Sequence, residues 1–344
     1  MRNKKAIDVL NKDDLIVITG AGGFIAGALA RYFSEQGFAR IRAIDKKPLD
    51  EWYQRVEGVE SVCMDLSEKD NCVKACQGAT EVYNLAADMG GMGFIERFRI
   101  ECLRSILINT HMIEAAYHAG AGRYFFSSSA CAYNTTLQED ANVRALKESD
   151  AYPAMAERGY GWEKLMSEMF CQEYWAEREM KTFIARFHNV YGPYGTWDGG
   201  REKAPAAICR KVIEARDSGK HEIVIWGDGL QTRSFMYIDD CINGIDMIMH
   251  CEELIATPIN LGSDRLVSIN ELVSIVEKIG GITLKCHYDP DAPTGVAGRN
   301  SDNTFIKQVL NWEPATPLEK GLEKTYRWIS QQYADRKAGK RTVS

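Results

Sequence analysis

A buried strand that runs straight into a glycine-rich turn and then a helix constrains the fold of this chain most. Leu15–Thr19 is a continuous apolar, β-branched run, typical of a strand buried on both faces of a sheet. Gly20 and Gly23 follow it, and a helical pattern continues from there to about Gln36. Such glycines permit a tight turn and a close backbone approach to a pyrophosphate, whose charge the helix N-terminus stabilises. A strand–turn–helix unit that binds nothing is the alternative at this point.

The second predicted strand indicates which dinucleotide such a turn would accept. Ile41–Ile44 is apolar and ends at Asp45. An acidic side chain at this place suits a ribose 2′-hydroxyl and disfavours a 2′-phosphate, so the sequence favours NAD over NADP. Lys46 and Lys47 come next and weaken that preference slightly.

Two further strands complete the predicted cofactor site. Val62–Leu66 ends beside an acidic residue, where an adenine edge is read, and Glu81–Ala87 ends in small residues that let a cofactor lie close. The residues predicted to bind the cofactor at these strand ends are Gly20, Gly23, Phe24, Ile25, Asp45, Asp65, Leu66, Ala86 and Ala87.

Composition narrows the class of protein. With 45% hydrophobic and 26% charged residues, the chain is typical of a soluble globular protein. Its net charge of −6 argues against nucleic acid binding, and no apolar run is long enough to span a membrane. The cysteines are scattered without a C-x-x-C pair, and the histidines show no metal-ligand spacing. This pattern predicts reduced thiols, no metal site and a cytoplasmic location.

The length of 344 residues predicts one large domain and one smaller domain. We expect an α/β fold, with a Rossmann-type doubly wound parallel sheet and a smaller C-terminal α/β substrate domain. The predicted boundaries are 1–187 and 228–258 for the NAD-binding domain, 188–227 and 259–335 for the substrate domain, and 336–344 for a polar tail. Within these domains, His188–Pro193, Gly227–Phe235 and Gly298–Asp302 are predicted to be turns or loops.

The segment after the next predicted strand carries the least ordinary residues. Tyr124–Phe126 leads into Ser127–Tyr133, a small-residue turn with a cluster of hydroxyl groups and Cys131. The ordinary interpretation of Cys131 is a small buried hydrophobe. Downstream, Tyr160 and Lys164 lie four residues apart and share one helix face, although a surface pair has the same spacing. Tyr160 would act as a base only if its phenol pKa fell from the usual value of about 10. A neighbouring Lys ammonium and a positively charged nicotinamide would both favour the phenolate.

Four motifs together resemble the extended short-chain dehydrogenase/reductase family over nearly the whole chain. They are Thr19-Gly20-x-x-Gly23-x-x-Ala26, Asn84-Leu85-Ala86-Ala87, Ser128-Ser129 and Tyr160-x-x-x-Lys164. Ala26 stands where a third glycine is usual, a small-for-small change. The resemblance implies NAD as cofactor and a hydride-transfer set of Ser129, Tyr160 and Lys164, with Lys164 also holding the cofactor ribose.

Longer matches resemble the branch of this family that epimerises GDP-mannose at C3 and C5. They cover 86–95, 128–131, 146–151, 186–189, 195–197, 199–207, 226–235 and 298–303. This resemblance implies transient oxidation at C4 by tightly bound NAD, which makes the C3 and C5 hydrogens acidic, and proton transfer by Cys131 and Lys203. The implied substrate-binding residues are Gly90, Ser129, Ala130, Cys131, Asn189, Glu202, Lys203, Lys211, Gln231, Arg233 and Arg299. Of these, the two arginines suit a diphosphate, and Lys211 could equally be a solvated helix charge.

The position of Cys131 supplies a separate argument. Related sugar-nucleotide 4,6-dehydratases carry a Thr-Asp-Glu run here, and Cys131 stands where their glutamate stands, two residues after Ser129. The lack of Asp-Glu argues against dehydration, and the thiol argues for proton transfer next to a carbonyl. Another NAD-dependent nucleotide-sugar 4-epimerase or dehydratase, and a non-catalytic NAD-binding regulator, are the alternatives. The helices Phe98–His118 and Met155–Tyr174 resemble the pair through which this family forms homodimers.

Overall fold

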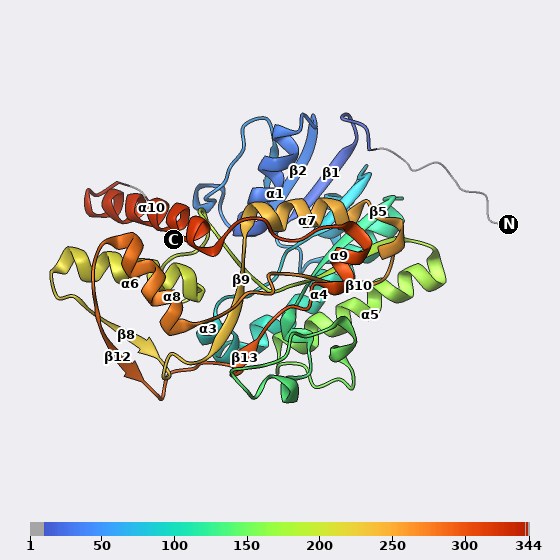
Figure 1. The fold of residues 1–344 in the computed structure, drawn as a ribbon. Coiled ribbons are helices and arrows are strands. Elements are labelled where there is room, and N and C mark those ends of the chain that lie inside the picture. The colour runs from blue at the N-terminus through green and yellow to red at the C-terminus, as the bar shows by residue number, and fades with distance from the viewer. Residues whose placement is uncertain (1–9, 341, 343–344) are drawn as a thin grey trace.

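The computed structural model describes residues 10–340 and 342, and a parallel sheet of seven strands forms the centre of this part of the chain (Figure 1). The strands lie in the spatial order β10-β6-β5-β4-β1-β2-β3. The strand order reverses between β1 and β4, which is where doubly wound sheets open a crevice for ligands. The predicted fold class is therefore confirmed. The strands are β1 (Leu15–Thr19), β2 (Arg40–Asp45), β3 (Glu60–Cys63), β4 (Glu81–Asn84), β5 (Arg123–Ser129), β6 (Lys181–Phe187) and β10 (Pro258–Leu261).

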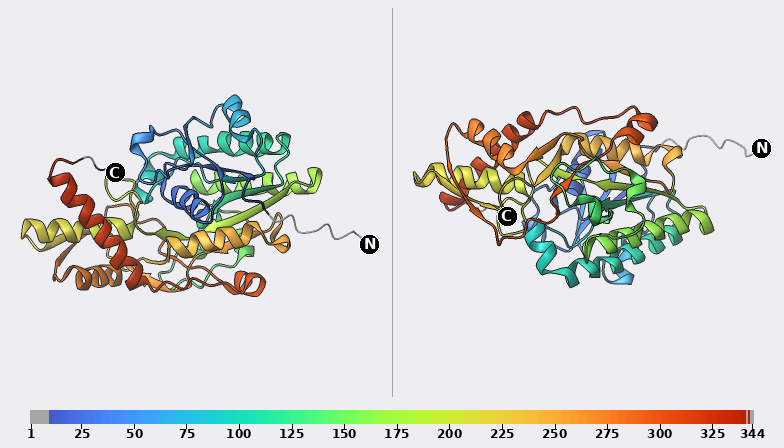
Figure 2. Two further views of the ribbon diagram at one scale, coloured as in Figure 1. Left: turned by 90° about the horizontal axis from the view of Figure 1, so that it is seen from above. Right: turned by 60° about the horizontal axis from the view of Figure 1, so that its bottom comes forward.

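Helices cover both faces of this sheet (Figures 1 and 2). The alternation within β1 shows why, because Ile16 and Ile18 pack in one hydrophobic cluster while Leu15 and Val17 pack in another. The first cluster includes α1 (Phe24–Glu35) and α7 (Ile238–Met249). The second includes α2 (Lys69–Cys76), α4 (Arg99–His118) and α5 (Tyr160–Arg178). A strand buried on both faces has to be apolar on both, as the sequence of β1 indicates.

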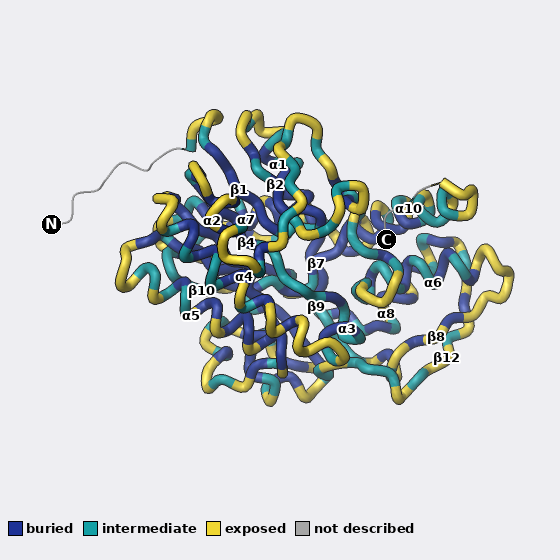
Figure 3. Tube along the Cα trace, turned by 180° about the vertical axis from the view of Figure 1, so that it is seen from behind, coloured by how far each residue is buried: buried dark blue, intermediate teal, exposed yellow. Residues whose placement is uncertain are grey.

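A second lobe lies beside the carboxyl ends of the large sheet (Figures 1 and 3). Its four-stranded sheet pairs β9 with β7, β11 and β13, and β8 pairs separately with β12. These strands are β7 (Asn189–Tyr191), β8 (Glu222–Trp226), β9 (Thr232–Tyr237), β11 (Leu266–Ser268), β12 (Lys285–Asp289) and β13 (Gly298–Arg299). Its helices α6 (Ala204–Ser218), α8 (Ile269–Gly280) and α10 (Leu318–Lys337) pack on one another. Helix α9 (Thr304–Leu310) packs on β10 of the large sheet, and α3 (Met92–Arg97) contacts α4.

The structure corrects the three predicted loops. The segments 188–193, 227–235 and 298–302 contain all or part of β7, β9 and β13. Strand β9 pairs with both of the others across long sequence separations. Sheet pairing also places β9 in the small sheet, although its residues were predicted to belong to the NAD-binding domain. It places β10 in the large sheet, although most of its residues were predicted to belong to the substrate domain. Apart from these two segments, the domain division stays a prediction.

Two predicted element ends also shift. Helix α5 begins at Tyr160 and not at Met155, because the preceding Gly159 has a φ of +89° that a helix cannot contain. Helix α10 continues to Lys337, so the predicted tail begins later: Arg336 pairs with Asp198 at 2.6 Å, which holds the last turn in place. Across the described residues, no helix has the length and apolar character needed to cross a bilayer.

Candidate active site

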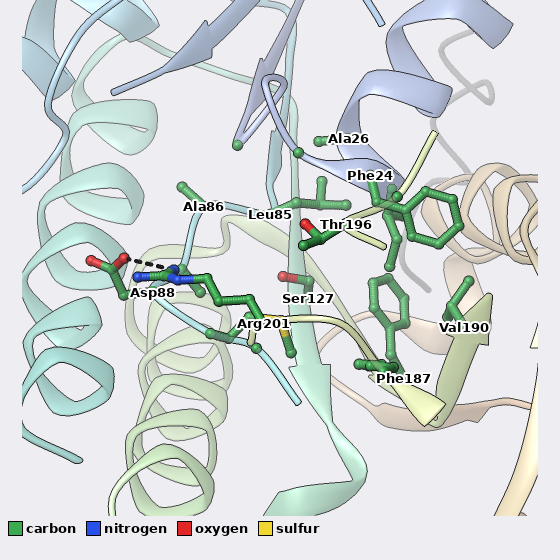
Figure 4. Close-up of a pocket in the computed structure, with 18 of the residues that line it drawn as sticks. Phe24, Ala26, Leu85, Ala86, Asp88, Ser127, Phe187, Val190, Thr196 and Arg201 are labelled. Atoms are coloured by element: carbon green, nitrogen blue, oxygen red, sulfur yellow. Dashed lines mark ion pairs between the residues drawn. The ribbon is translucent and has the colours of Figure 1, made fainter. Parts of the chain in front are cut away.

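A cavity of about 630 Å³ opens at the carboxyl ends of β1, β4 and β5 (Figure 4). Every residue predicted at the strand ends to bind the cofactor lines it, as do Gly90, Ser129, Tyr160 and Lys203. The cofactor residues concerned are Gly20, Gly23, Phe24, Ile25, Asp45, Asp65, Leu66, Ala86 and Ala87. The structure therefore brings residues from four separate strands of the sequence into one crevice.

The backbone of this crevice fits a dinucleotide. Gly20 has a φ of +75°, and a Cβ there would lie 2.9 Å from the carbonyl oxygen of Leu85. Gly23 precedes α1, whose N-terminus no side chain caps, so a phosphate has access to free N–H groups there. Asp45 accepts hydrogen bonds from the N–H of Gly22 at 3.0 Å and of Lys47 at 2.9 Å, which fixes its carboxylate at the ribose end.

Ser129 ends β5 and Tyr160 begins α5, so the strand end and the helix start place the two hydroxyl groups at one wall of the cavity. Burial raises the pKa of Tyr160 well above its ordinary value, and the nearby Cys131 raises it further, whereas a hydrogen bond with Ser129 lowers it. The predicted lowering depends on the Lys164 ammonium and the nicotinamide charge of bound NAD together, so it stays a prediction.

Lys164 lies behind this wall and not in the cavity lining. It is 1% exposed, its Nζ has no hydrogen-bond partner among the described residues, and Glu163 Oε2 is 3.9 Å away. Burial lowers the pKa of Lys164. A buried ammonium without a hydrogen bond costs free energy unless a ligand supplies an acceptor, and a ribose hydroxyl has that chemistry.

A buried network of polar side chains, which we did not predict from the sequence, connects the strand ends of the cavity to the helix that carries Tyr160 and Lys164. Thr19 donates to Asn84 at 2.8 Å, Asn84 donates to Asn109 at 2.9 Å, and Asn109 donates to Glu163. The Thr19 hydroxyl also accepts from the N–H of Ala86 at 3.2 Å. The network therefore joins β1, β4, α4 and α5 beneath the cavity. The sequence feature that could have indicated this network is Asn109, a polar residue inside an otherwise apolar helical pattern.

Cys131 follows Ser129 in the short 3-10 turn Ala130–Ala132, and its N–H donates to the Ser129 hydroxyl at 3.2 Å. The thiol packs in an apolar cluster with Tyr160, and Arg299 Nη1 donates to Cys131 Sγ at 3.4 Å. Burial raises the pKa of Cys131, as does Glu157, whereas Arg299 lowers it. Lys203 stands at the N-terminus of α6, where burial lowers its pKa and Cys131 acts against that shift. Both shifts favour the neutral forms, a thiol and an amine.

The other predicted substrate residues do not line this cavity. Arg233 donates to backbone carbonyls, among them Val296 at 2.6 Å and Thr294 at 3.0 Å. Lys211 donates to the carbonyl of Val224 at 2.7 Å, so it is not merely a solvated charge. Gln231 donates to the carbonyl of Trp226 at 2.8 Å, and its Oε1 is buried without a partner. The predicted substrate residues outside the lining are Ala130, Cys131, Asn189, Glu202, Lys211, Gln231, Arg233 and Arg299, whose substrate contacts stay a prediction.

An ion pair that the sequence did not predict crosses the cavity. Arg201 Nη1 lies 3.7 Å from Asp88 Oδ1, which joins the loop before α6 to the loop after β4 (Figure 4). Lys46 pairs with the other Asp88 oxygen at 2.6 Å. No periodic pattern marks these residues, since each lies in a loop.

Comparison with known proteins gives the same architecture. The model of the NAD dependent epimerase/dehydratase family matches residues 16–262. Among solved structures, UDP-glucuronic acid 4-epimerase from Bacillus cereus, in complex with UDP-glucuronic acid and NAD, has a TM-score of 0.80 and 25% identity, covering 92% of this chain and 99% of that one. UDP-glucose 4-epimerase from Thermotoga maritima has a TM-score of 0.82 and 22% identity over the same shares of each chain, and so shares the fold.

Curated relatives are more similar still. GDP-mannose 3,5-epimerase 1 of Oryza sativa subsp. japonica is 45% identical over 318 residues, which cover 92% of this chain and 82% of that protein. GDP-mannose 3,5-epimerase of Arabidopsis thaliana is 44% identical over 330 residues, which cover 96% of this chain and 85% of that protein. From the family model, these relatives and the dinucleotide crevice together, the chain belongs to the NAD dependent epimerase/dehydratase family.

Proposed function

We propose that this chain epimerises GDP-mannose at C3 and C5, giving GDP-L-galactose, and GDP-L-gulose where C5 alone inverts. The observation that carries the proposal is Cys131, a thiol two residues after Ser129 that touches Arg299 and lies beside Tyr160. A 4-epimerase needs no acid or base at C3 or C5. The high identity to the two plant GDP-mannose 3,5-epimerases supports the same assignment.

The residues divide the chemistry into two tasks. When bound, NAD supplies reversible oxidation of the C4 alcohol, which makes the hydrogens on C3 and C5 acidic. Tyr160 takes the proton of the C4 hydroxyl, Ser129 holds the C4 oxygen, and Lys164 holds the cofactor ribose. Cys131 and Lys203 then remove a proton from one face of each carbon and return one to the other face. The pKa of the Cys131 thiol is raised and that of the Lys203 ammonium is lowered. Such shifts suit two groups that each take up and release protons.

Product analysis tests the proposal. Purified protein is incubated with GDP-mannose and, separately, with UDP-glucose and UDP-glucuronic acid, and the sugars released by hydrolysis are identified. Galactose and gulose of the L series from GDP-mannose alone are expected. Conversion of a UDP-sugar at C4 would establish the rival 4-epimerase assignment. NAD binding without turnover of any nucleotide sugar would establish a regulator.

We also propose that the protein is a homodimer that uses α4 and α5. Exposed apolar side chains recur at helical spacing on both helices, with Ile100 73% and Met166 54% exposed. The set is Ile100, Leu103, Leu107, Trp162, Met166 and Met169. A second copy would cover both stripes at once. Light scattering should give twice the chain mass, and Met166→Glu should give monomers; a monomeric wild type would refute the proposal.

A cytoplasmic location is proposed from the cysteines. All ten are free thiols in the structure, and most are buried. A reducing compartment keeps such thiols unpaired. Fractionation of the native host, with thiol counting on the recovered protein, is the measurement; ten free thiols in the cytosolic fraction are expected, and a secreted form would contradict the proposal.

A further inference from the structure

Each of the three guanidinium nitrogens of Arg299 makes a hydrogen bond with a residue at or near the Cys131 thiol. Its Nη1 donates to Cys131 Sγ at 3.4 Å, its Nε donates to Gln138 Oε1 at 2.6 Å, and its Nη2 pairs with Glu157. Arg299 is 6% exposed, Cys131 6% and Gln138 0%. Hydrogen bonds to a charged donor in such a dry setting are stronger than those at a surface.

The backbone holds the same groups together independently of their side chains. The N–H of Glu157 donates to the carbonyl of Cys131 at 3.0 Å, so the carboxylate and the thiol are anchored to one another. Arg299 comes from β13, which pairs in parallel with β9, and the N–H of Ala297 donates to the carbonyl of Gln138 at 3.0 Å. Three distant segments thus converge on one sulfur atom.

We propose that Arg299 is a further catalytic residue, whose guanidinium stabilises the Cys131 thiolate during proton transfer, and that Glu157 and Gln138 are positioning residues that hold it against the sulfur. The role in turnover rests on the proposed function. At whichever carbon Cys131 acts as base, the C–H bond breaks, the S–H bond forms, and the electron pair passes to the oxygen at C4. Arg299 keeps its charge throughout and gains a stronger contact whenever the sulfur is anionic.

The charges around the sulfur give the sign of the effect. Arg299 and Glu157 act on the thiol in opposite directions, since the cation lowers the pKa of Cys131 and the carboxylate raises it. Lys203, Lys164, Arg233, Tyr160 and Cys102 also act electrostatically on Cys131 or are acted on by it. These five groups stay unchanged in the variants below. An opposite charge this close shifts a pKa by about 1–3 units.

Alkylation of the free protein tests the proposal without turnover. The rate at which iodoacetamide modifies Cys131 is followed against pH by mass spectrometry of its peptide, in the full-length chain without nucleotide sugar. Arg299→Gln removes the cation and leaves the Glu157 carboxylate without its ion-pair partner. Both changes disfavour the thiolate, so alkylation at neutral pH should slow about tenfold or more. Glu157→Gln keeps an acceptor for Arg299 but loses the anion, so alkylation should accelerate. The double variant should return toward the wild-type rate.

The direction of each rate change distinguishes an electrostatic effect on the thiol from a general loosening of the site. A site that merely loosened would expose the thiol and speed alkylation in every variant, including Arg299→Gln; that result, or no change, would overturn the proposal. Arg265→Gln is the matched control, because Arg265 also pairs with a carboxylate, at 2.8 Å, but lies at the surface. Should Arg299→Gln fail to fold, a slower rate with Glu157→Gln still overturns the proposal. If the variants show the expected alkylation rates but the wild-type protein leaves GDP-mannose unchanged, only the proposed function is refuted.

Discussion

Replacing Glu168 tests whether the ion pair beneath the active site depends on its burial. Glu168 accepts two hydrogen bonds from Arg186, at 2.9 Å and 2.7 Å, and both side chains are 2% exposed. Glu168→Gln keeps the shape but leaves the guanidinium without its counter-charge. Stranding one member of a buried pair costs about 3–5 kcal/mol, and the remaining amide acceptor places this variant near 3.

A surface pair of similar geometry provides the control. Arg265 donates two hydrogen bonds to Glu319, at 3.0 Å and 2.8 Å, but the side chains are 44% and 48% exposed. Glu319→Gln should therefore cost at most about 1 kcal/mol. Urea unfolding followed by circular dichroism, with comparison of free energies at equal slopes, gives both values. Equal costs for the two variants would refute the claim that burial decides the strength of the pair.

Three further outcomes follow from the site. Gly20→Ala should weaken NAD binding measured by calorimetry and lower stability, because a Cβ would lie 2.9 Å from a carbonyl oxygen at a φ of +75°; unchanged affinity would contradict the cradle. The pKa of His188 is lowered from 6.5 to about 4 by burial, so the folded state binds fewer protons and urea stability should fall as pH drops from 6.5 to about 4. His188→Asn should remove that slope, and a slope that persists would assign it elsewhere. Cys131→Ala should abolish solvent exchange at C5 of GDP-mannose, and wild-type epimerisation by this variant would end its assignment.

Sequence reasoning succeeded where local patterns coincide with the large sheet. The apolar run of β1, the glycines after it and Asp45 are local features, so every cofactor residue predicted at the strand ends lines one cavity. It failed for the small sheet, because β9 begins with the polar run Thr232-Arg233-Ser234 and β13 consists of Gly298 and Arg299, so neither begins as an apolar run. Their pairing partners also lie far along the chain.

The same limit applies to the active site. Ser129, Cys131 and Tyr160 were predicted to meet, and they do, because a strand end and a helix start place them. The contact of Arg299 with the thiol depends on β13 pairing with β9, and so was beyond reach from spacing alone. Burial also raises the pKa of Tyr160, and a sequence does not display the packing on which desolvation depends.

Isotope exchange tests the central claim most directly. GDP-mannose is incubated with the protein in D₂O, and the recovered nucleotide sugars are analysed for deuterium at each carbon by NMR. Because Cys131 and Lys203 are proposed to exchange protons at carbons next to C4, deuterium is expected at C3 and C5 and not at C4. Inversion at C4 without deuterium at either neighbour, or no incorporation at all, would contradict the account.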